Sequence, residues 1–366
     1  TGSKGKSTTV FLITKFLEAA GYKVAAIGSL GFKIGDREWP NNLKMTMPGR
    51  WKIQKFLAEA LKAGCQFAVL EVTSEGIKQK RHWGIKFDAA VFTNLEKEHI
   101  ESHGSFENYY EAKQQLFKIT KNIHILNADS SYVDLFSKFP VKKKVFYRLK
   151  DKKTNSHYTA AALKWESFLL GDFNRYNILA AVETVKSYGV SDEVIQRALD
   201  KIKSIPGRME FIDRGQDFKI VVDYAHTSGS LEAVYKTLKP KAKQLICVLG
   251  AAGGGRDKWK RPIFGQLAEN YCDWIILTDE DPYDEPPEKI VEEVNSGIEN
   301  KKKVEKIMDR REAIRKALTL AGKEDIVVIT GKGSEISMAV AGGKKIPWSD
   351  KNMVLEVLEN IKNKKL

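Results

Sequence analysis

The sequence predicts an α/β protein of two domains, and four features support this prediction. Short apolar runs alternate with amphipathic stretches along the 366 residues, as they do where strands of a mostly parallel sheet alternate with helices. A glycine-rich loop precedes the first series, and polar residues follow each run of the second series. Pro206 and Gly207 interrupt the pattern between them. We therefore expect a P-loop domain at residues 1–205 and a Rossmann-like domain at residues 206–366.

The first domain is expected to contain four buried strands and five helices. The strands are the apolar runs "KVAAIGS", "QFAVLEVT", "FDAAVFTNL" and "NIHILNAD". Apolar periodicity predicts helices at residues 8–20, 51–63, 106–119, 173–189 and 191–202. Gly21 and Gly64 occupy C-cap positions, and Ser191 occupies an N-cap position. Residues 144–170 show no regular pattern.

The second domain repeats the alternation of strands and helices. Its strand candidates are "FKIVVDYAH", "QLICVLGA", "DWIILTDE" and "DIVVITGK". Its helix candidates are residues 231–238, 261–269, 287–298, 310–320 and 350–361. Ligands of such folds bind beyond the carboxyl ends of the strands, so the polar residues that follow these runs are candidates for a binding site.

The composition indicates which kinds of partner and which cellular compartment suit this protein. Lys and Arg total 61 against 47 Asp and Glu, and this net charge of +14 suits an anionic partner. The lysine clusters at residues 142–144 and 301–303 read as solvated faces, and no basic patch contains interleaved aromatic residues, so we do not expect a nucleic-acid partner. No apolar run approaches the ~20 residues of a membrane helix. Three separated cysteines without zinc or disulfide spacing favour a cytoplasmic protein.

The loop "TGSKGKSTT" has the chemistry of a phosphate site. Gly2 and Gly5 enclose two residues where the usual Walker string encloses four. Backbone amides at the start of a helix still favour an anion, Lys6 could reach the β- and γ-phosphates, and Ser7 could ligate Mg²⁺. The alternative is a glycine-rich turn before a helix.

Three further residues are candidates for metal or catalytic roles. Glu71 ends a predicted strand, where a carboxylate could face Mg²⁺. His99 follows the next strand, and Lys113 lies inside a predicted helix. Each has a structural alternative: a solvated strand end, a loop histidine and an exposed helix lysine.

The ordered segments "TGSKGKSTT", "EVTSEGIKQKR", "FTNLEKEHIESHG", "YYEAKQQLF", "DYAHT", "GGRDKWKRP" and "GKGSE" together resemble the Mur ligase family over essentially the whole chain. These are the ATP-dependent amino-acid ligases of peptidoglycan precursor synthesis. The resemblance implies a central P-loop ATPase domain and an ADP-forming ligase, of the branch that adds a diamino acid to UDP-MurNAc-L-Ala-D-Glu. The carboxylate would be activated as an acyl phosphate before the amine attacks.

The resemblance also assigns roles to single residues. It places ATP contacts at Gly2, Gly5, Lys6, Ser7, Thr8, Asn174, Asn177, Arg208, Asp223, Tyr224 and His226. Ser7 and Glu71 would hold one Mg²⁺, and His99 and Lys113 would serve a second. Lys113 matches a lysine that CO₂ converts to a carbamate, which is an anionic oxygen ligand. Lys6, His99 and Lys113 are the expected catalytic residues.

The remaining assignments concern the two substrates. The muramoyl-dipeptide would contact Thr46, Thr73, Ser74, Gln79 and Arg81. The incoming amino acid would contact Arg256, Glu280, Asp281, Tyr283, Gly331 and Glu335. We expect a monomer that acts on these small molecules and does not engage a membrane.

The sequence departs from the family pattern at several points. Family members that use meso-diaminopimelate read D-N-P-R, whereas here Tyr283 replaces the Arg and acids stand at Glu280 and Asp281. Two acids suit an ammonium at the distal end of the incoming amino acid, so we expect the substrate to be lysine or another basic amino acid. Met47 replaces a Thr and Ser334 a His, and Ser228-Gly229 replace Pro-Asp.

The family's N-terminal uridine-binding domain and first strand have no counterpart, so we expect a fragment of a longer reading frame. Two alternative functions remain open. One is a related ligase of the cyanophycin or folyl-polyglutamate type, because cyanophycin-type enzymes share a D-Y-x-H string. The other is a non-catalytic binding protein of the same fold.

Overall fold

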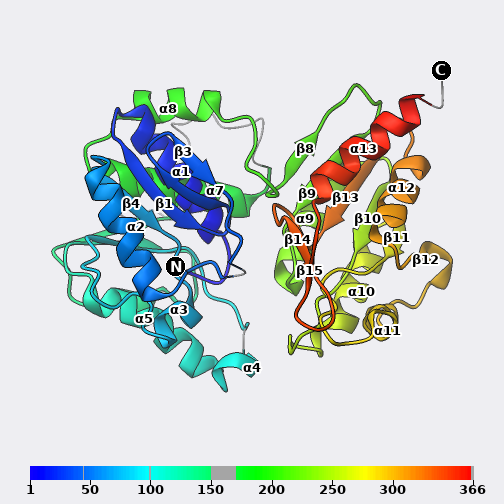
Figure 1. Ribbon diagram of the computed structural model, residues 1–366, viewed down its shortest axis with the longest axis horizontal. Coiled ribbons are helices and arrows are strands. Elements are labelled where there is room, and N and C mark those ends of the chain that lie inside the picture. The colour runs from blue at the N-terminus through cyan, green and yellow to red at the C-terminus, as the bar shows by residue number, and fades with distance from the viewer. Residues whose placement is uncertain (44, 99, 150–169, 364–366) are drawn as a thin grey trace. The chain divides into compact units, whose positions relative to one another are not determined.

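The computed structural model describes residues 1–43, 45–98, 100–149 and 170–363 (Figure 1). Contacts divide the chain into two compact units, Thr1–Lys203 and Ser204–Leu366. Within the described ranges, no helix combines the length and apolar character needed to cross a bilayer. Most of the segment expected to be irregular, residues 144–170, lies outside the described residues.

Unit 1 alternates helices with short strands. In chain order it contains α1 (Lys6–Ala19), β1 (Val24–Gly28), β2 (Gly31–Ile34), β3 (Arg37–Trp39), α2 (Arg50–Lys62), β4 (Phe67–Leu70), α3 (Ser74–Lys78), β5 (Ala89–Phe92), α4 (Ile100–His103), α5 (Phe106–Ile119), β6 (Ile123–Asn127), α6 (Val133–Ser137), β7 (Lys143–Tyr147), α7 (Asp172–Lys186) and α8 (Asp192–Lys201). All four predicted strands and all five predicted helices are present; α5 matches its expected range, and the other elements have ends shifted by a few residues.

The strands of unit 1 form two sheets, in the orders β3-β2-β1-β4 and β5-β6-β7. The pairs β1–β4, β5–β6 and β6–β7 are parallel, as predicted. The strands β1, β2 and β3 form an antiparallel meander that the sequence did not predict. Strand β1 was predicted, but β2 and β3 are only four and three residues long and are half-buried or exposed, so they lack a distinctive apolar run.

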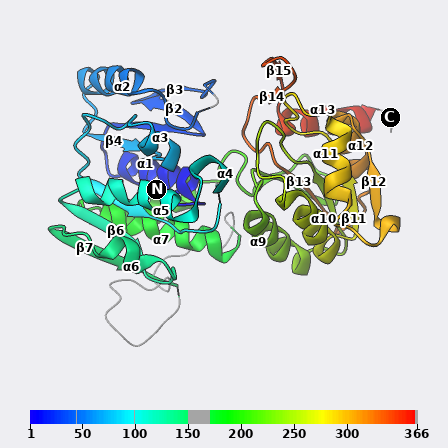
Figure 2. The ribbon, with the colours of Figure 1, turned by 90° about the horizontal axis from the view of Figure 1, so that it is seen from below.

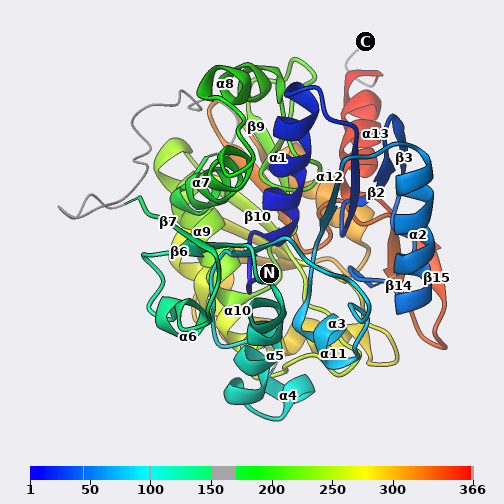
Figure 3. The ribbon, with the colours of Figure 1, turned by 90° about the vertical axis from the view of Figure 1, so that its left-hand side faces the viewer.

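Helix α1 follows the glycine-rich loop at residues 1–5 and packs against two other helices of unit 1. It lies beside α7 and α8, as Figure 3 shows. Leu12 and Phe16 are fully buried on this helix. The residue before it, Gly5, has a φ of 79°, and its backbone turns the loop into the helix.

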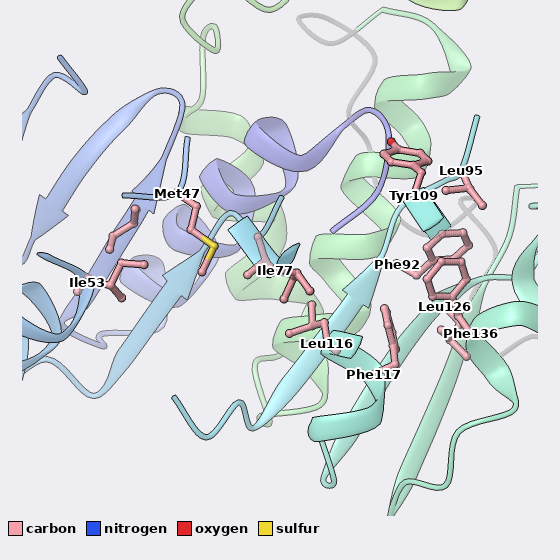
Figure 4. Close-up of a cluster of buried hydrophobic side chains, with 14 of the residues drawn as sticks. Met47, Ile53, Ile77, Phe92, Leu95, Tyr109, Leu116, Phe117, Leu126 and Phe136 are labelled. Atoms are coloured by element: carbon pink, nitrogen blue, oxygen red, sulfur yellow. The ribbon is translucent and has the colours of Figure 1, made fainter. Parts of the chain in front are cut away.

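Unit 1 contains a cluster of buried apolar side chains (Figure 4). It extends from Met47 and Ile53 through Ile77 to Phe117 and Phe136. Met47, the residue that replaces a family Thr, is 1% exposed and belongs to this core. The segments on either side of the predicted dipeptide positions are therefore anchored by buried side chains.

Unit 2 is a doubly wound α/β domain. In chain order it contains β8 (Glu210–Ile212), β9 (Lys219–Asp223), α9 (Ser228–Leu238), η2 (Lys239–Lys241), β10 (Leu245–Leu249), α10 (Lys260–Tyr271), β11 (Trp274–Leu277), α11 (Pro287–Asn295), η3 (Lys301–Lys303), β12 (Val304–Lys306), α12 (Arg310–Leu320), β13 (Ile326–Thr330), β14 (Ser337–Ala339), β15 (Lys345–Pro347) and α13 (Asp350–Asn363). The four predicted strands and five predicted helices are all present.

The main sheet of unit 2 has the order β12-β11-β10-β13-β9-β8, and only β8 pairs antiparallel. Figure 2 shows α12 and α13 on one side of this sheet and α9 and α10 on the other. The order reverses between β10 and β13. Ligands of doubly wound folds bind beyond the strand ends at such a reversal, which is where the predicted amino-acid positions lie.

Candidate active site

The loop that precedes α1 is held by the segment that follows β5. Asn94 Oδ1 accepts a hydrogen bond from Lys4 N at 2.8 Å, and Thr93 Oγ1 donates to Lys4 O at 2.6 Å. A Cβ at Gly2 would lie 2.0 Å from Thr93 Oγ1, and a Cβ at Gly5 would lie 2.0 Å from Asn177 Oδ1. Only glycine fits at these two positions, so the backbone amides of the loop are held in one arrangement.

Lys6 lies over this loop. Its Nζ donates to Gly2 O at 3.0 Å and to Ser3 O at 2.9 Å. An ammonium held against a ring of backbone groups at the start of a helix is suited to bind a phosphate. The next residues, Ser7 and Thr8, are buried in the first turn of α1.

Glu71 is the centre of a cluster of oxygen atoms and is 3% exposed. Ser7 Oγ donates to Glu71 Oε1 at 3.1 Å, and Ser29 N donates to Glu71 Oε2 at 2.8 Å. Ser29 Oγ also lies 2.9 Å from Thr46 Oγ1. A carboxylate with two or three hydroxyl oxygens is a donor set that Mg²⁺ prefers.

Ser29 was not among the predicted site residues. It directly follows β1, as Glu71 directly follows the parallel neighbour β4. The rule that was applied to Glu71, a polar residue at the carboxyl end of a buried strand, would also have selected Ser29.

Lys113 is buried beside the loop, with 2% of its surface exposed. Its Nζ donates to Gly2 O at 2.9 Å and lies 4.5 Å from the centroid of the Tyr109 ring. Burial, and then the charge of Lys6, lower the pKa of Lys113 well below its ordinary value. The structure thus excludes the exposed-helix alternative for this lysine. His99 lies outside the described residues.

The predicted dipeptide positions fall into two groups within unit 1. Arg81 Nη1 donates to Met47 O at 2.6 Å, which places Arg81 beside the segment that carries Thr46. Arg81 Nε also donates to Gln79 Oε1 at 2.9 Å.

The second group lies at the start of α3. Thr73 Oγ1 accepts from Gly76 N at 3.0 Å and caps this helix. Ser74 Oγ lies 3.2 Å from His103 Nε2. His103, which the sequence reasoning did not select, is buried, and burial lowers its pKa. Its imidazole is therefore neutral at pH 7.

Two of the predicted ATP contacts, Asn174 and Asn177, lie on α7. Asn177 is 5% exposed and lies against Gly5, as described above. Asn174 Nδ2 donates to Leu170 O at 2.9 Å, a contact that fixes the start of its own helix. The structure therefore connects Asn177, but not Asn174, to the loop by a direct contact.

Three of the predicted nucleotide positions of unit 2 pack together near the end of β9, with the Tyr224 and His226 rings edge to face. The Arg208 guanidinium lies 4.2 Å from the Tyr224 ring centroid, and the Tyr224 and His226 rings lie 4.5 Å apart. Burial lowers the pKa of His226 well below its ordinary value, so its ring is neutral.

Asp223 differs from Arg208, Tyr224 and His226 because its carboxylate accepts hydrogen bonds from backbone amides. It is buried and accepts from Met209 N and Ala225 N, both at 2.7 Å.

The predicted amino-acid positions surround a buried lysine that the sequence reasoning missed. Lys332 Nζ donates to Asp281 Oδ2 at 2.8 Å and also to Glu335 Oε2. Asp281 Oδ1 accepts from Ala339 N at 2.6 Å, and Glu335 Oε1 accepts from Tyr224 OH at 3.0 Å. Asp281 and Glu335 therefore share one lysine ammonium inside the protein.

Glu280 is the acid that remains. It is 5% exposed, and burial raises its pKa to about 7. A Cβ at Gly331, whose φ is 105°, would lie 2.2 Å from Glu280 Oε2, so the carboxylate needs the glycine beside it. An acid that is costly to ionise in the free protein is suited to receive a cationic ligand.

The last two predicted positions differ in exposure. Arg256 is exposed on the glycine-rich loop that follows β10. Tyr283 is half-buried, with a φ of 54° that is uncommon for a residue with a side chain. Such strain persists where the surrounding structure fixes it, and it is concentrated at functional sites.

Two family models match this chain. Residues 1–185 match the family described as "Mur ligase middle domain", and residues 207–333 match "Mur ligase, glutamate ligase domain". The UDP-N-acetylmuramoyl-L-alanyl-D-glutamate--2,6-diaminopimelate ligase of Syntrophomonas wolfei is 36% identical, over 98% of this chain and 77% of its own length. That of Aquifex aeolicus is also 36% identical, over 98% and 76%.

Solved structures give the same result. A structure of UDP-N-acetylmuramoyl-L-alanyl-D-glutamate--2,6-diaminopimelate ligase superposes with a TM-score of 0.66 at 32% identity, covering 99% of this chain and 77% of that one. A pseudomurein peptide ligase type C from Methanothermus fervidus reaches the same TM-score at 19% identity, which shows a shared fold. The two family matches and the relatives that align along nearly its whole length show that this chain belongs to the Mur ligase family.

Proposed function

We propose that this protein joins UDP-MurNAc-L-Ala-D-Glu to a diamino acid in an ATP-dependent reaction of peptidoglycan precursor synthesis. The observation that carries the proposal is the Ser7–Glu71 contact beside the loop that Lys6 covers. This arrangement combines an anion site with a hard-cation site, as phosphoryl transfer from ATP requires. The printed names of the relatives supply the substrates.

The reaction would proceed in two steps. The substrate's D-Glu carboxylate takes the γ-phosphoryl group of ATP, which releases ADP and leaves an acyl phosphate. The amine of the diamino acid then attacks the carbonyl carbon, phosphate leaves, and the nitrogen loses a proton. Lys6 and the loop amides would bind the triphosphate and offset its charge, while Ser7 and Glu71 would hold one Mg²⁺.

The second Mg²⁺ would be held by His99 and by a carbamate on Lys113. A cationic lysine would repel a metal ion, whereas a carbamate is an anionic oxygen ligand. The burial of Lys113 supports this assignment, because CO₂ reacts with the neutral amine that burial favours.

For the amino acid, we propose that Glu280 receives the distal ammonium. Tyr283 cannot neutralise a distal carboxylate, and this favours lysine or another basic amino acid. The relatives' names point instead to 2,6-diaminopimelate. A ligase that consumes ATP is expected in the cytoplasm, and we expect it to act as a monomer.

The test is diamino-acid-dependent phosphate release in the presence of ATP, Mg²⁺, bicarbonate and UDP-MurNAc-L-Ala-D-Glu. Lysine, meso-diaminopimelate and ornithine are compared on this chain and on the longest reading frame that contains it. Release with lysine alone supports both the ligase and the Glu280 assignment. Release with meso-diaminopimelate supports the ligase and overturns the preference for lysine. No release with any amino acid from either protein overturns the proposed function.

A further inference from the structure

Arg261 is a buried cation of unit 2 that the proposed reaction does not use. It lies in the first turn of α10, and its side chain is 1% exposed. Its Nη1 donates to Glu285 Oε2 at 3.1 Å and to Glu293 Oε2 at 2.6 Å. Its Nη2 donates to Ala252 O at 3.1 Å and to Glu285 Oε1 at 3.3 Å.

These contacts connect three segments, two of which carry residues predicted to contact the incoming amino acid. Ala252 lies in the loop that carries Arg256, Glu285 ends the segment that begins with Glu280, and Glu293 lies on α11. One guanidinium therefore connects the loop that carries Arg256 and the segment that begins with Glu280 to α11.

The loops and helices joined by Arg261 are also in close backbone contact. Gly253 N donates to Asp281 O at 2.8 Å, and a Cβ at Gly253 would lie 2.2 Å from Pro282 O. Behind them, a Cβ at Gly265 of α10 would lie 2.1 Å from Val294 O of α11. Little space remains for either loop to move independently while Arg261 holds its three partners.

We infer that Arg261 is a positioning residue that sets the spacing between the Arg256 loop and the Glu280 segment, and so controls affinity for the diamino acid. This inference rests on the proposed function. A planar guanidinium can serve two carboxylates and a carbonyl at once, whereas a lysine ammonium is a single point charge. Lysine at this position would therefore preserve the charge but only part of the geometry.

The test compares Arg261→Met and Arg261→Lys with the control Lys258→Ala. Lys258 Nζ lies 3.3 Å from the same Glu285 carboxylate, but its side chain is 54% exposed. We expect Arg261→Met to raise the KM for the diamino acid about tenfold or more, because small displacements of binding groups are costly. Arg261→Lys should give a smaller rise, and Lys258→Ala none. The KM values for ATP and for the nucleotide-linked dipeptide should stay unchanged.

A purely structural role gives a different result. It would lower kcat through a smaller active fraction and leave all KM values unchanged, and this outcome would overturn the inference. If Arg261→Met does not fold, Glu293→Gln removes one partner and should raise the KM for the diamino acid to a smaller extent. An unchanged KM in that variant would count equally against the inference.

Hydrogen exchange separates failure of this inference from failure of the proposed function. If the wild-type protein shows no ligase activity, exchange is compared between it and Arg261→Met, or Glu293→Gln if the first variant does not fold. Faster exchange confined to residues 251–257 and 280–285 would support the positioning role. Unchanged exchange there, or faster exchange throughout residues 204–363, would overturn it.

Discussion

Replacing Glu280 by Gln should stabilise the free protein at alkaline pH. Burial raises the pKa of this carboxyl from an ordinary value of 4.5 to about 7. Below pH 4.5 both folded and unfolded forms are protonated and there is no penalty. As the pH rises towards 7 the unfolded form ionises first, so stability falls, and above pH 7 the loss levels off at about 3 kcal/mol. Glu280→Gln removes this loss.

Urea unfolding at pH 5 and pH 8 measures the effect. We expect Glu280→Gln to exceed wild type by about 3 kcal/mol at pH 8 and by less than about 1 kcal/mol at pH 5. The control is Glu288→Gln, an exposed glutamate in the first turn of α11, which should change stability by less than about 0.5 kcal/mol at either pH. Equal stability of Glu280→Gln and wild type at pH 8 would refute this reasoning.

The same variant links stability to the proposed function. Gln cannot pair with an ammonium as a carboxylate does, so Glu280→Gln should raise the KM for the diamino acid while leaving the KM for ATP unchanged. A stabilised protein with an unchanged KM for every amino acid would show that Glu280 does not face the substrate.

Three further predictions concern Lys113, the glycine-rich loop at residues 1–5 and a buried ion pair of unit 2. Lys113→Ala should abolish phosphate release, with partial rescue by a small carboxylate; full activity would refute the carbamate. Gly5→Ala should abolish ATP binding measured by calorimetry, whereas Gly64→Ala, at a similar φ of 78° in open space, should not. Asp350→Asn should lower the free energy of unfolding in urea by about 3–5 kcal/mol, because it disrupts the buried ion pair between Asp350 Oδ2 and Arg310 Nη2 at 2.8 Å. The exposed control Glu356→Gln should lower it by less than about 1 kcal/mol.

Local pattern accounts for the elements that were predicted well. The ranges expected for α5 and α12, residues 106–119 and 310–320, coincide with those in the structure. Helix periodicity and end signals lie within neighbouring residues, so they can be read without tertiary contacts. The short strands β2, β3, β14 and β15 escaped prediction because they are defined by their pairing and carry no long apolar run.

The sequence by itself determined the fold class, the order of the elements and the chemical types gathered at the strand ends, because these depend on local composition and spacing. Only the tertiary structure decided which charges compensate one another. It paired Lys332 with Asp281, and it buried Glu280 so that the pKa of this carboxyl rises to about 7. It also joined Ser29 to Glu71, and Arg261 to Glu285 and Glu293. Such pairings join residues far apart in the chain, and they form only when the packed strands and helices bring those residues together.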